Sequence, residues 1–160
     1  MLKITAPFRE KKEVIPLIEA GADELYCGYL SPEWERRYTS LEFERKGGGS
    51  NFTDLAELRQ AVDIAHKKEI PVHLTLNGLY VKRQYPLLLK IVRQLKRVDL
   101  DGYIVADIGL LLTLRELGFK KQLHISTGGT VFNSEAARFY KNFGVSRIVL
   151  DRQTTLESMQ

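Results

Sequence analysis

Polar residues that could bind or orient a ligand recur where the short apolar runs of this chain end. They are Thr5, Cys27, Thr75, Asn77, Asp107, Ser126, Thr127, Asp151 and Arg152. If the runs are parallel strands, their carboxyl ends meet at one edge of a sheet, and α/β proteins bind ligands at that edge. Carboxylate, carboxamide and hydroxyl groups there would hydrogen-bond a substrate, and a guanidinium would hold an anionic group. We therefore expect the functional site at this edge.

Two histidines lie on the polar side of their apolar runs. Because side chains alternate along a strand, His73 shares one face with Thr75 and Asn77, and His124 repeats the pattern two runs later. Helices should cover the apolar faces, so the polar faces would line a barrel interior and need hydrogen-bond partners or a ligand. We predict that the two imidazoles either hold neighbouring strands together or bind substrate. A metal site formed by His73, His124 and Asp107 is geometrically conceivable but matches no spacing motif.

A long irregular stretch, residues 28–52, holds Arg36 and Arg37 between Trp34 and Tyr38. Long loops in compact domains are often functional. These aromatic and guanidinium groups could stack on and neutralise a nucleic acid or a carboxylate substrate, so Arg36 and Arg37 are predicted to bind substrate. The alternative is a solvated loop with one anchoring aromatic side chain.

Cys27 and the segment 126–130 each allow two interpretations. Cys27 is either reactive or, as free cysteines usually are, a small buried apolar group. The segment Ser126-Thr-Gly-Gly-Thr130 could hold an anion on its backbone amides. A plain turn is the favoured interpretation of that segment.

Short β-branched or apolar runs alternate with longer stretches of helical period, which predicts strand–helix units around a parallel sheet. Six strands are expected, at 2–5, 24–27, 72–76, 103–106, 123–126 and 147–150, and five helices, at 13–20, 54–68, 85–97, 108–117 and 135–143. An open doubly wound sheet and a partial (β/α) barrel both fit this order. The polar faces favour the barrel, and a whole barrel typically needs about 200 residues or more. We therefore expect one α/β domain over residues 1–160, as the N-terminal part of a longer TIM-barrel-like protein.

Residues at the expected helix ends agree with this division. Thr53 and Ser134 are the predicted N-caps, and Gly21, Gly118 and Gly144 are the predicted left-handed residues after a helix. A capping box at 154–157 indicates the start of a further helix, and the sequence stops three residues after the box. That spacing favours a truncated product or one module of a longer protein over a ragged C-terminus.

The composition fits one soluble domain. The 160 residues include 24 Lys and Arg against 20 Asp and Glu, and 44% are hydrophobic, which excludes a disordered chain. The net charge of +4 is spread along the chain and points to no partner. No apolar run of about 18 residues or secretory leader occurs, so a cytoplasmic protein without membrane contact is expected. A single cysteine excludes an internal disulfide and cannot alone hold zinc or an iron–sulfur cluster.

Several segments, in this order and spacing, match a known pattern. They are GADELYCG at 21–28, NFTDLAEL at 51–58, VHLTLN at 72–77, GYIVAD at 102–107, HIST at 124–127, FNSEAA at 132–137 and GVSRIVLDR at 144–152. Together they resemble the collagenase-like peptidase family U32 over nearly the whole chain. Family position selects Asp107, Asn77 and Arg152 as catalytic candidates and Ser126 and Thr127 as substrate-binding ones. Arg152 would fix an anionic substrate group, which Asp107 and Asn77 would orient.

The resemblance implies an N-terminal, barrel-like catalytic domain, followed in complete members by cysteines that bind a four-iron four-sulfur cluster. This chain stops before those cysteines, so no cofactor is expected in it and the cluster would belong to a complete protein. The chain also has Gly128 after the Ser-Thr pair, where many members have Gln, and Gln153 after Arg152, where many have Glu.

Family members carry an old peptidase label, and several support hydroxylation of RNA bases or of the ubiquinone ring. We therefore expect a catalytic-domain fragment of a protease or of an iron–sulfur-dependent hydroxylation enzyme, with a small-molecule, peptide or RNA substrate. One alternative is a non-catalytic module that pairs through open sheet edges, as a homo-oligomer or with a missing C-terminal part. Another is RNA binding through residues 34–37.

Overall fold

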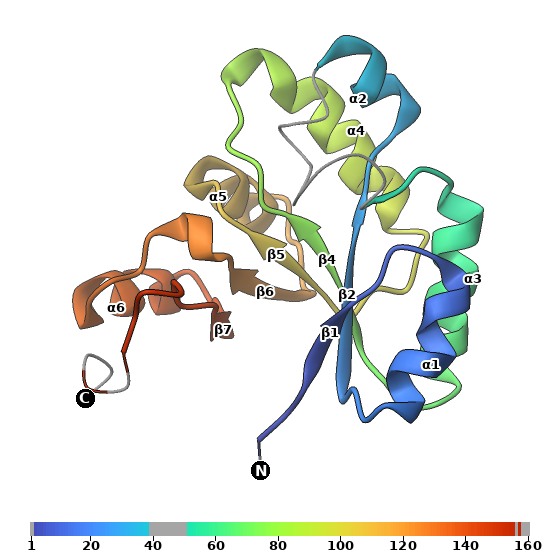
Figure 1. The fold of residues 1–160 in the computed structure, drawn as a ribbon. Coiled ribbons are helices and arrows are strands. Elements are labelled where there is room, and N and C mark those ends of the chain that lie inside the picture. Colours follow the sequence, from blue (N-terminus) through green and yellow to red (C-terminus); the bar gives the residue numbers. More distant parts are fainter. Residues whose placement is uncertain (1, 39–50, 156, 158–160) are drawn as a thin grey trace.

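The structure is a computed structural model that describes residues 2–38, 51–155 and 157 (Figure 1). Its strands are β1 (Thr5–Pro7), β2 (Glu24–Tyr29), β3 (Asn51–Phe52), β4 (Val72–Leu76), β5 (Gly102–Val105), β6 (Gln122–Ile125) and β7 (Arg147–Ile148). Its α-helices are α1 (Val14–Glu19), α2 (Pro32–Arg37), α3 (Leu55–His66), α4 (Tyr85–Leu95), α5 (Ile108–Glu116) and α6 (Ser134–Asn142). The described residues also form short 3-10 turns: η1 (Lys11–Glu13), η3 (Lys82–Gln84) and η4 (Thr127–Gly129).

Six strands form one parallel sheet in the order β1-β2-β4-β5-β6-β7, and β3 pairs with β2. Every strand pair is parallel, because a helix or a helical turn returns the chain to the same end of the sheet between successive strands. The sheet curves into a half-barrel with the helices against its outer side (Figure 1). The predicted partial barrel of about six strands is therefore confirmed.

The helices bury one apolar face against the outer side of the sheet. In α4 the buried side chains recur one and four positions apart, which places them on a single face; they are Leu87, Leu88, Ile91, Val92 and Leu95. They belong to one core cluster with outward-facing strand residues such as Leu74, Leu76 and Tyr103. Since full burial of a leucine side chain contributes roughly 1.5–3 kcal/mol, these side chains stabilise the packing of α4 on the outer face of the sheet.

The opposite, concave face carries the polar residues that the alternation predicts. His73 and Thr75 of β4 are buried there. Gly102 of β5 pairs with His73, and a Cβ on Gly102 would stand 2.9 Å from the His73 ring. A side chain at position 102 would therefore push this imidazole away from β5, which explains the glycine.

All six predicted strands and five predicted helices are present, with shifts at their ends. The first strand begins at Thr5 instead of Leu2, and two elements were not predicted, α2 and β3. The N-caps are also one residue off. Asp54 accepts the Ala56 N–H at 2.6 Å and Asn133 accepts the Ala136 N–H at 2.9 Å, so a carboxylate and a carboxamide cap the helices in place of the hydroxyl groups of Thr53 and Ser134.

The predicted left-handed glycines are confirmed, because Gly21, Gly118 and Gly144 all have positive φ. The helix expected from the capping box at 154–157 falls largely outside the described residues, as does the middle of the loop predicted over 28–52. Within the described ranges, the helices are all too short or too polar to cross a membrane.

Candidate functional site

A buried ion pair lies across the concave face near the amino-terminal end of the strands. Glu24 opens β2 and is 2% exposed, and Arg147 opens β7. Both Arg147 Nη atoms donate to the Glu24 carboxylate, Nη2 to Oε1 at 2.8 Å. Lys3 lies 3.6 Å from the same carboxylate. Hydrogen bonds from Arg147 hold the pKa of Glu24 at about 2, so Glu24 is charged at neutral pH.

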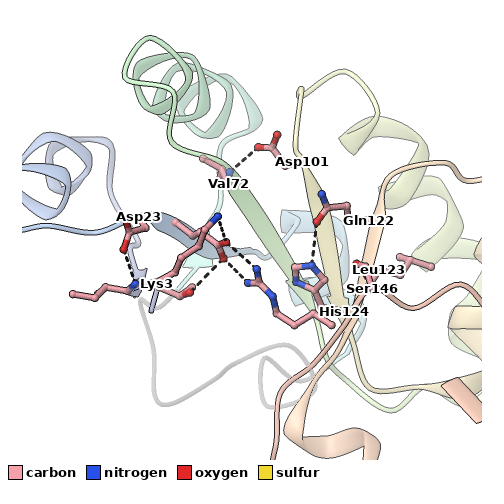
Figure 2. A network of polar contacts seen from close by, with 12 residues as sticks. Lys3, Asp23, Val72, Asp101, Gln122, Leu123, His124 and Ser146 are labelled. Atoms are coloured by element: carbon pink, nitrogen blue, oxygen red, sulfur yellow. Dashed lines mark hydrogen bonds and ion pairs between the residues drawn. The ribbon is translucent and has the colours of Figure 1, made fainter. Parts of the chain in front are cut away.

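Two imidazoles pack beside this ion pair. Figure 2 shows His124 on one side of the network and Lys3 on the other. The rings of His73 and His124 are 4.5 Å apart, and His124 Nε2 lies 3.3 Å from the carboxamide oxygen of Gln122. Burial lowers the pKa of both imidazoles and the charge of nearby Arg147 acts in the same direction, so that the pKa of His124 falls to about 4. Both imidazoles are therefore neutral at neutral pH.

The predicted alternatives for the histidines were strand cross-links or substrate ligands. The structure shows ring packing between β4 and β6 in place of hydrogen bonds between strands. Neither ring nitrogen of His73 has a partner in hydrogen-bonding geometry among the described residues, although Gln122 is near enough to favour its charged form. Substrate binding by His73 and His124 stays a prediction.

Asp107 lies at the other end of the sheet, directly after β5, where protein donors occupy its carboxylate. It caps α5 by accepting the Leu110 N–H at 2.7 Å. It also accepts the Tyr85 hydroxyl at 2.7 Å and the Tyr80 N–H at 3.1 Å, both from the β4–α4 segment. A Cβ on Gly109 would stand 2.4 Å from the Tyr85 oxygen, so the glycine permits this contact. Asp107 therefore positions the β4–α4 loop, and a catalytic role for it stays a prediction.

The carboxyl ends of β2 and β4 bring uncharged polar groups together. The Asn51 side chain lies over Gly28, where a Cβ would meet its oxygen at 1.7 Å. Thr75 Oγ1 is next to the same glycine and donates to the Cys27 carbonyl at 3.1 Å. Asn77, the predicted catalytic carboxamide, follows β4 and is half-buried. This corner of the sheet can donate and accept hydrogen bonds without carrying charge.

The segment 126–130 forms a 3-10 turn, as the favoured interpretation predicts. The Ser126 N–H donates to the Val105 carbonyl at 2.8 Å, which fixes the turn to the end of β5. The Tyr140 hydroxyl donates to the Gly129 carbonyl at 2.9 Å and holds the turn against α6. Ser126 is buried and Thr127 is exposed, so the neighbouring Thr127 is the member of the pair that solvent or a ligand reaches.

The remaining predicted cations differ in their surroundings. Arg152 follows β7 and is exposed. Arg36 and Arg37 are both exposed, and Arg37 pairs with Glu33 at 3.1 Å within α2. Trp34 on the same helix is fully buried, with its ring against Tyr38 and Tyr80. The buried Trp34 anchors this segment and its ring is not available to a base, but it lies on a helix and not in the solvated loop of that alternative. Substrate binding by Arg36 and Arg37 stays a prediction.

In the part of the chain that the structure describes, the side-chain donors do not fit a metal ion or an iron–sulfur cluster. Cys27, the single cysteine, is buried in the core on the side that the helices cover, and burial raises the pKa of its thiol. Among the described residues no three His, Cys, Asp or Glu side chains form a metal-binding group, so the conceived set of His73, His124 and Asp107 is wrong. A cluster of this type takes about four cysteine ligands.

Sequence reasoning missed the partners that hold these groups in place. Glu24, Arg147 and Gln122 each open a strand, and Tyr85 opens a helix. A signal existed for Glu24, since a carboxylate that shares the inner face of an otherwise apolar strand must find a cation. No pattern in the sequence indicated which cation, because Arg147 is far away along the chain and curvature of the sheet decides the contact.

Comparison with known proteins places the chain in a family. The model of peptidase family U32 matches residues 9–160. The chain belongs to peptidase family U32. It is similar to a collagenase of Porphyromonas gingivalis, with 24% identity over 99% of this U32 chain and 35% of the relative. It is similar also to a tRNA hydroxylation protein P of Helicobacter pylori, with 26% identity over 97% of the chain and 34% of the relative.

The U32 chain thus spans about a third of the length of these relatives. A solved structure of a U32 peptidase matches 94% of the chain and 59% of its own length, with a TM-score of 0.67 and 17% identity. At that identity the likeness concerns the fold, and it agrees with the half-barrel described above.

Proposed function

We propose that this U32 chain is the N-terminal catalytic-domain portion of an enzyme that hydroxylates an RNA base. The family is common to proteins named for peptide cleavage and for RNA hydroxylation. The choice between peptide cleavage and RNA hydroxylation rests on the contacts that the candidate catalytic side chains make. In the described part of the chain, the candidate nucleophile and bases are buried or bonded to other protein groups and do not form a nucleophile–base pair; they are Cys27, His73, His124 and Asp107.

Peptide cleavage by protein side chains needs a nucleophile with an adjacent base. The Cys27 thiol is buried and its pKa is raised. The two buried imidazoles contact each other and Gln122, and the Asp107 carboxylate accepts three protein donors. These engagements leave the candidates suited to binding and orientation: Asn77, Thr127 and Arg152.

Binding and orientation are what a base-modifying enzyme requires of this portion. The Asn77 carboxamide both donates and accepts, as the edge of a nucleobase does. The exposed Arg152 guanidinium matches a phosphate. Catalytic oxidising chemistry would come from groups outside this chain's described donors, since those do not fit an iron–sulfur cluster.

The test is mass spectrometry of nucleosides from tRNA and rRNA of the source organism after disruption of the gene. The proposal predicts the loss of a hydroxylated pyrimidine nucleoside and its return when the intact gene is restored. Restoration with Arg152→Ala should fail to return it while the protein accumulates normally. An unchanged nucleoside profile, together with loss of cleavage of a collagen-like peptide, would contradict the proposal and favour a peptidase.

Assembly through the sheet edges is a second candidate, favoured by the exposed outer strands. β1 and β7 end the order of the six-stranded sheet, and Ile4 and Val149 beside them are exposed. Unpaired strand edges invite pairing with another segment. Light scattering coupled to gel filtration tests it, because a homo-oligomer has a multiple of 18.3 kDa for this chain and a stable monomer contradicts pairing between copies.

A further inference from the structure

Exposed apolar side chains gather on the loops that follow the carboxyl ends of the central strands. Leu79 and Val81 in the β4–α4 loop are 69% and 54% exposed, and Phe132 in the β6–α6 loop is 65% exposed. Isolated exposed apolar residues need no explanation, but a group of them at the binding edge of an α/β sheet indicates an interaction site. We call the loops 77–84, 106–107 and 126–133 the loop rim.

Contacts between these loops make the loop rim one continuous surface. The Tyr80 N–H bonded to Asp107 joins the β4–α4 loop to the end of β5. Gly128 lies close to Ala106, since a Cβ on this glycine would stand 3.2 Å from the alanine Cβ. The Tyr38 hydroxyl donates to the Arg83 carbonyl at 3.2 Å, which brings the end of α2 against the rim. Figure 1 shows β4 leading up into the β4–α4 loop beside α4, and β5 leading towards α5.

Charge at this surface is predominantly positive. Lys82 and Arg83 of the rim and Arg36 of α2 are exposed, and none of the three forms an ion pair with another described residue. Of the acidic groups nearby, Glu33 is paired with Lys90 at 2.5 Å and with Arg37, and Asp107 is occupied by its three donors. Glu35 is the exposed acid of α2. The rim therefore offers cations to an anionic partner.

We propose that the loop rim binds single-stranded RNA, with Lys82 and Arg83 on the phosphates and Phe132 stacked on a base. This proposal rests on the proposed function, because it names the surface through which the same substrate would reach the strand ends. An exposed phenylalanine and exposed cations on the same loop rim are groups that single strands use, since every base has a face for stacking and every linkage has a charge. A purely apolar partner would leave Lys82 and Arg83 unpaired.

The experiment measures fluorescence anisotropy of a fluorescein-labelled, mixed-sequence single-stranded RNA of about 20 nucleotides as the purified protein is added, at several salt concentrations. The Lys82→Ala/Arg83→Ala variant should bind more weakly, and the slope of log affinity against log salt should fall by about 0.7 for each phosphate that is no longer neutralised. Phe132→Ala should weaken binding roughly five-fold to 100-fold with the salt slope unchanged, because it removes stacking and no charge.

The matched control is Lys67→Ala/Lys68→Ala, which removes the same charge from an exposed pair between α3 and the amino end of β4. It should bind RNA as the wild type does. If the rim variants bound RNA with the same affinity as the control variant, the proposal would be overturned. The exposed apolar side chains would then be assigned to a protein contact. A wild-type protein that shows no salt-dependent binding would overturn the proposed function as well.

Discussion

Near the amino-terminal end of the sheet, Glu24, Arg147, His73 and His124 turn inward and contact one another, whereas the carboxyl-terminal end presents Thr127, Arg152 and the loop rim to solvent. The first group joins β2, β4, β6 and β7 across the concave face. The second lies on loops that a partner can reach. Arginine therefore stabilises the half-barrel at one end, as Arg147, and is available for binding at the other, as Arg152.

The difference teaches how an incomplete barrel keeps its curvature. Burying a carboxylate is costly unless a cation and hydrogen bonds compensate it, and Arg147 meets that need only if the sheet bends enough to bring β7 towards β2. In (β/α) barrels the amino-terminal end generally serves stability and the carboxyl-terminal end function. The following predictions test this division.

The largest effect is expected from removing the cation of the buried pair. Arg147→Ala leaves the Glu24 carboxylate buried with a long contact to Lys3 at 3.6 Å and a weak hydrogen bond from the Thr5 hydroxyl at 3.4 Å, which should lower the free energy of unfolding by about 3 kcal/mol. This is the lower end of the usual range, because the Arg147 side chain is 40% exposed and water screens part of the interaction. Urea unfolding followed by circular dichroism measures it.

Arg59→Ala is the matched control, since Arg59 is exposed on α3 and should change the unfolding free energy by less than about 0.5 kcal/mol. Equal midpoints for the two variants would show that the ion pair does not stabilise the half-barrel. The Glu24→Gln/Arg147→Met double variant should recover part of the loss, because it leaves no buried charge uncompensated.

The second largest effect on the free energy of unfolding is expected from lowering the pH. The folded pKa of His124 is lowered from 6.5 to about 4, so the unfolded chain binds the proton more tightly. Stability is then fully present above pH 6.5 and falls as the pH drops towards 4, by roughly 2–3 kcal/mol, because one pKa unit corresponds to 1.36 kcal/mol. The pKa of Glu24, about 2, adds a further loss below its unfolded value of 4.5.

Urea midpoints measured between pH 7 and pH 4 test this. His124→Gln should make the curve less steep in that range, with the remaining slope coming from His73 and Glu24. If the wild type showed no loss of stability between pH 6.5 and 4.5, the buried imidazoles would have to be stabilised in their charged form, and the described cluster would be wrong.

The carboxyl-terminal end can be tested through the group that positions its central loop. Tyr85→Phe removes the hydroxyl that donates to Asp107 and should cost about 1 kcal/mol. The loss should be local, with faster hydrogen exchange at the Tyr80 amide that shares the carboxylate. Uniformly faster exchange across the sheet would show that Tyr85 supports the whole fold instead of the loop.

Most of the fold could be predicted from the sequence, because strand alternation and helix periodicity depend on neighbouring residues. Leu87 and Leu88 mark a helix face, and Gly118 a helix end, from local spacing alone. The short α2 and β3 escaped prediction because their stability comes from contacts such as the buried Trp34 against Tyr80. The N-caps were missed by one residue because Asp54 and Asn133 compete with adjacent hydroxyls for the same amides.

The candidate site was less predictable. Strand ends could be located, and the resemblance selected Asp107 among them, yet its three donors come from Tyr80, Tyr85 and Leu110 on two different segments. The Glu24–Arg147 contact depends on the curvature of the whole sheet. Such contacts are set by three-dimensional packing, which no local pattern encodes.

The most direct test of the division between the two ends compares variants of two arginines on either side of β7. Arg147 opens this strand and Arg152 follows it. Arg147→Ala and Arg152→Ala would each be measured for urea midpoint and for restoration of the hydroxylated nucleoside in the gene-disrupted organism. We expect Arg152→Ala to unfold at the wild-type midpoint and to restore no modification, while Arg147→Ala unfolds at lower urea. An Arg152→Ala protein that restores full modification, or that loses as much stability as Arg147→Ala, would contradict the account.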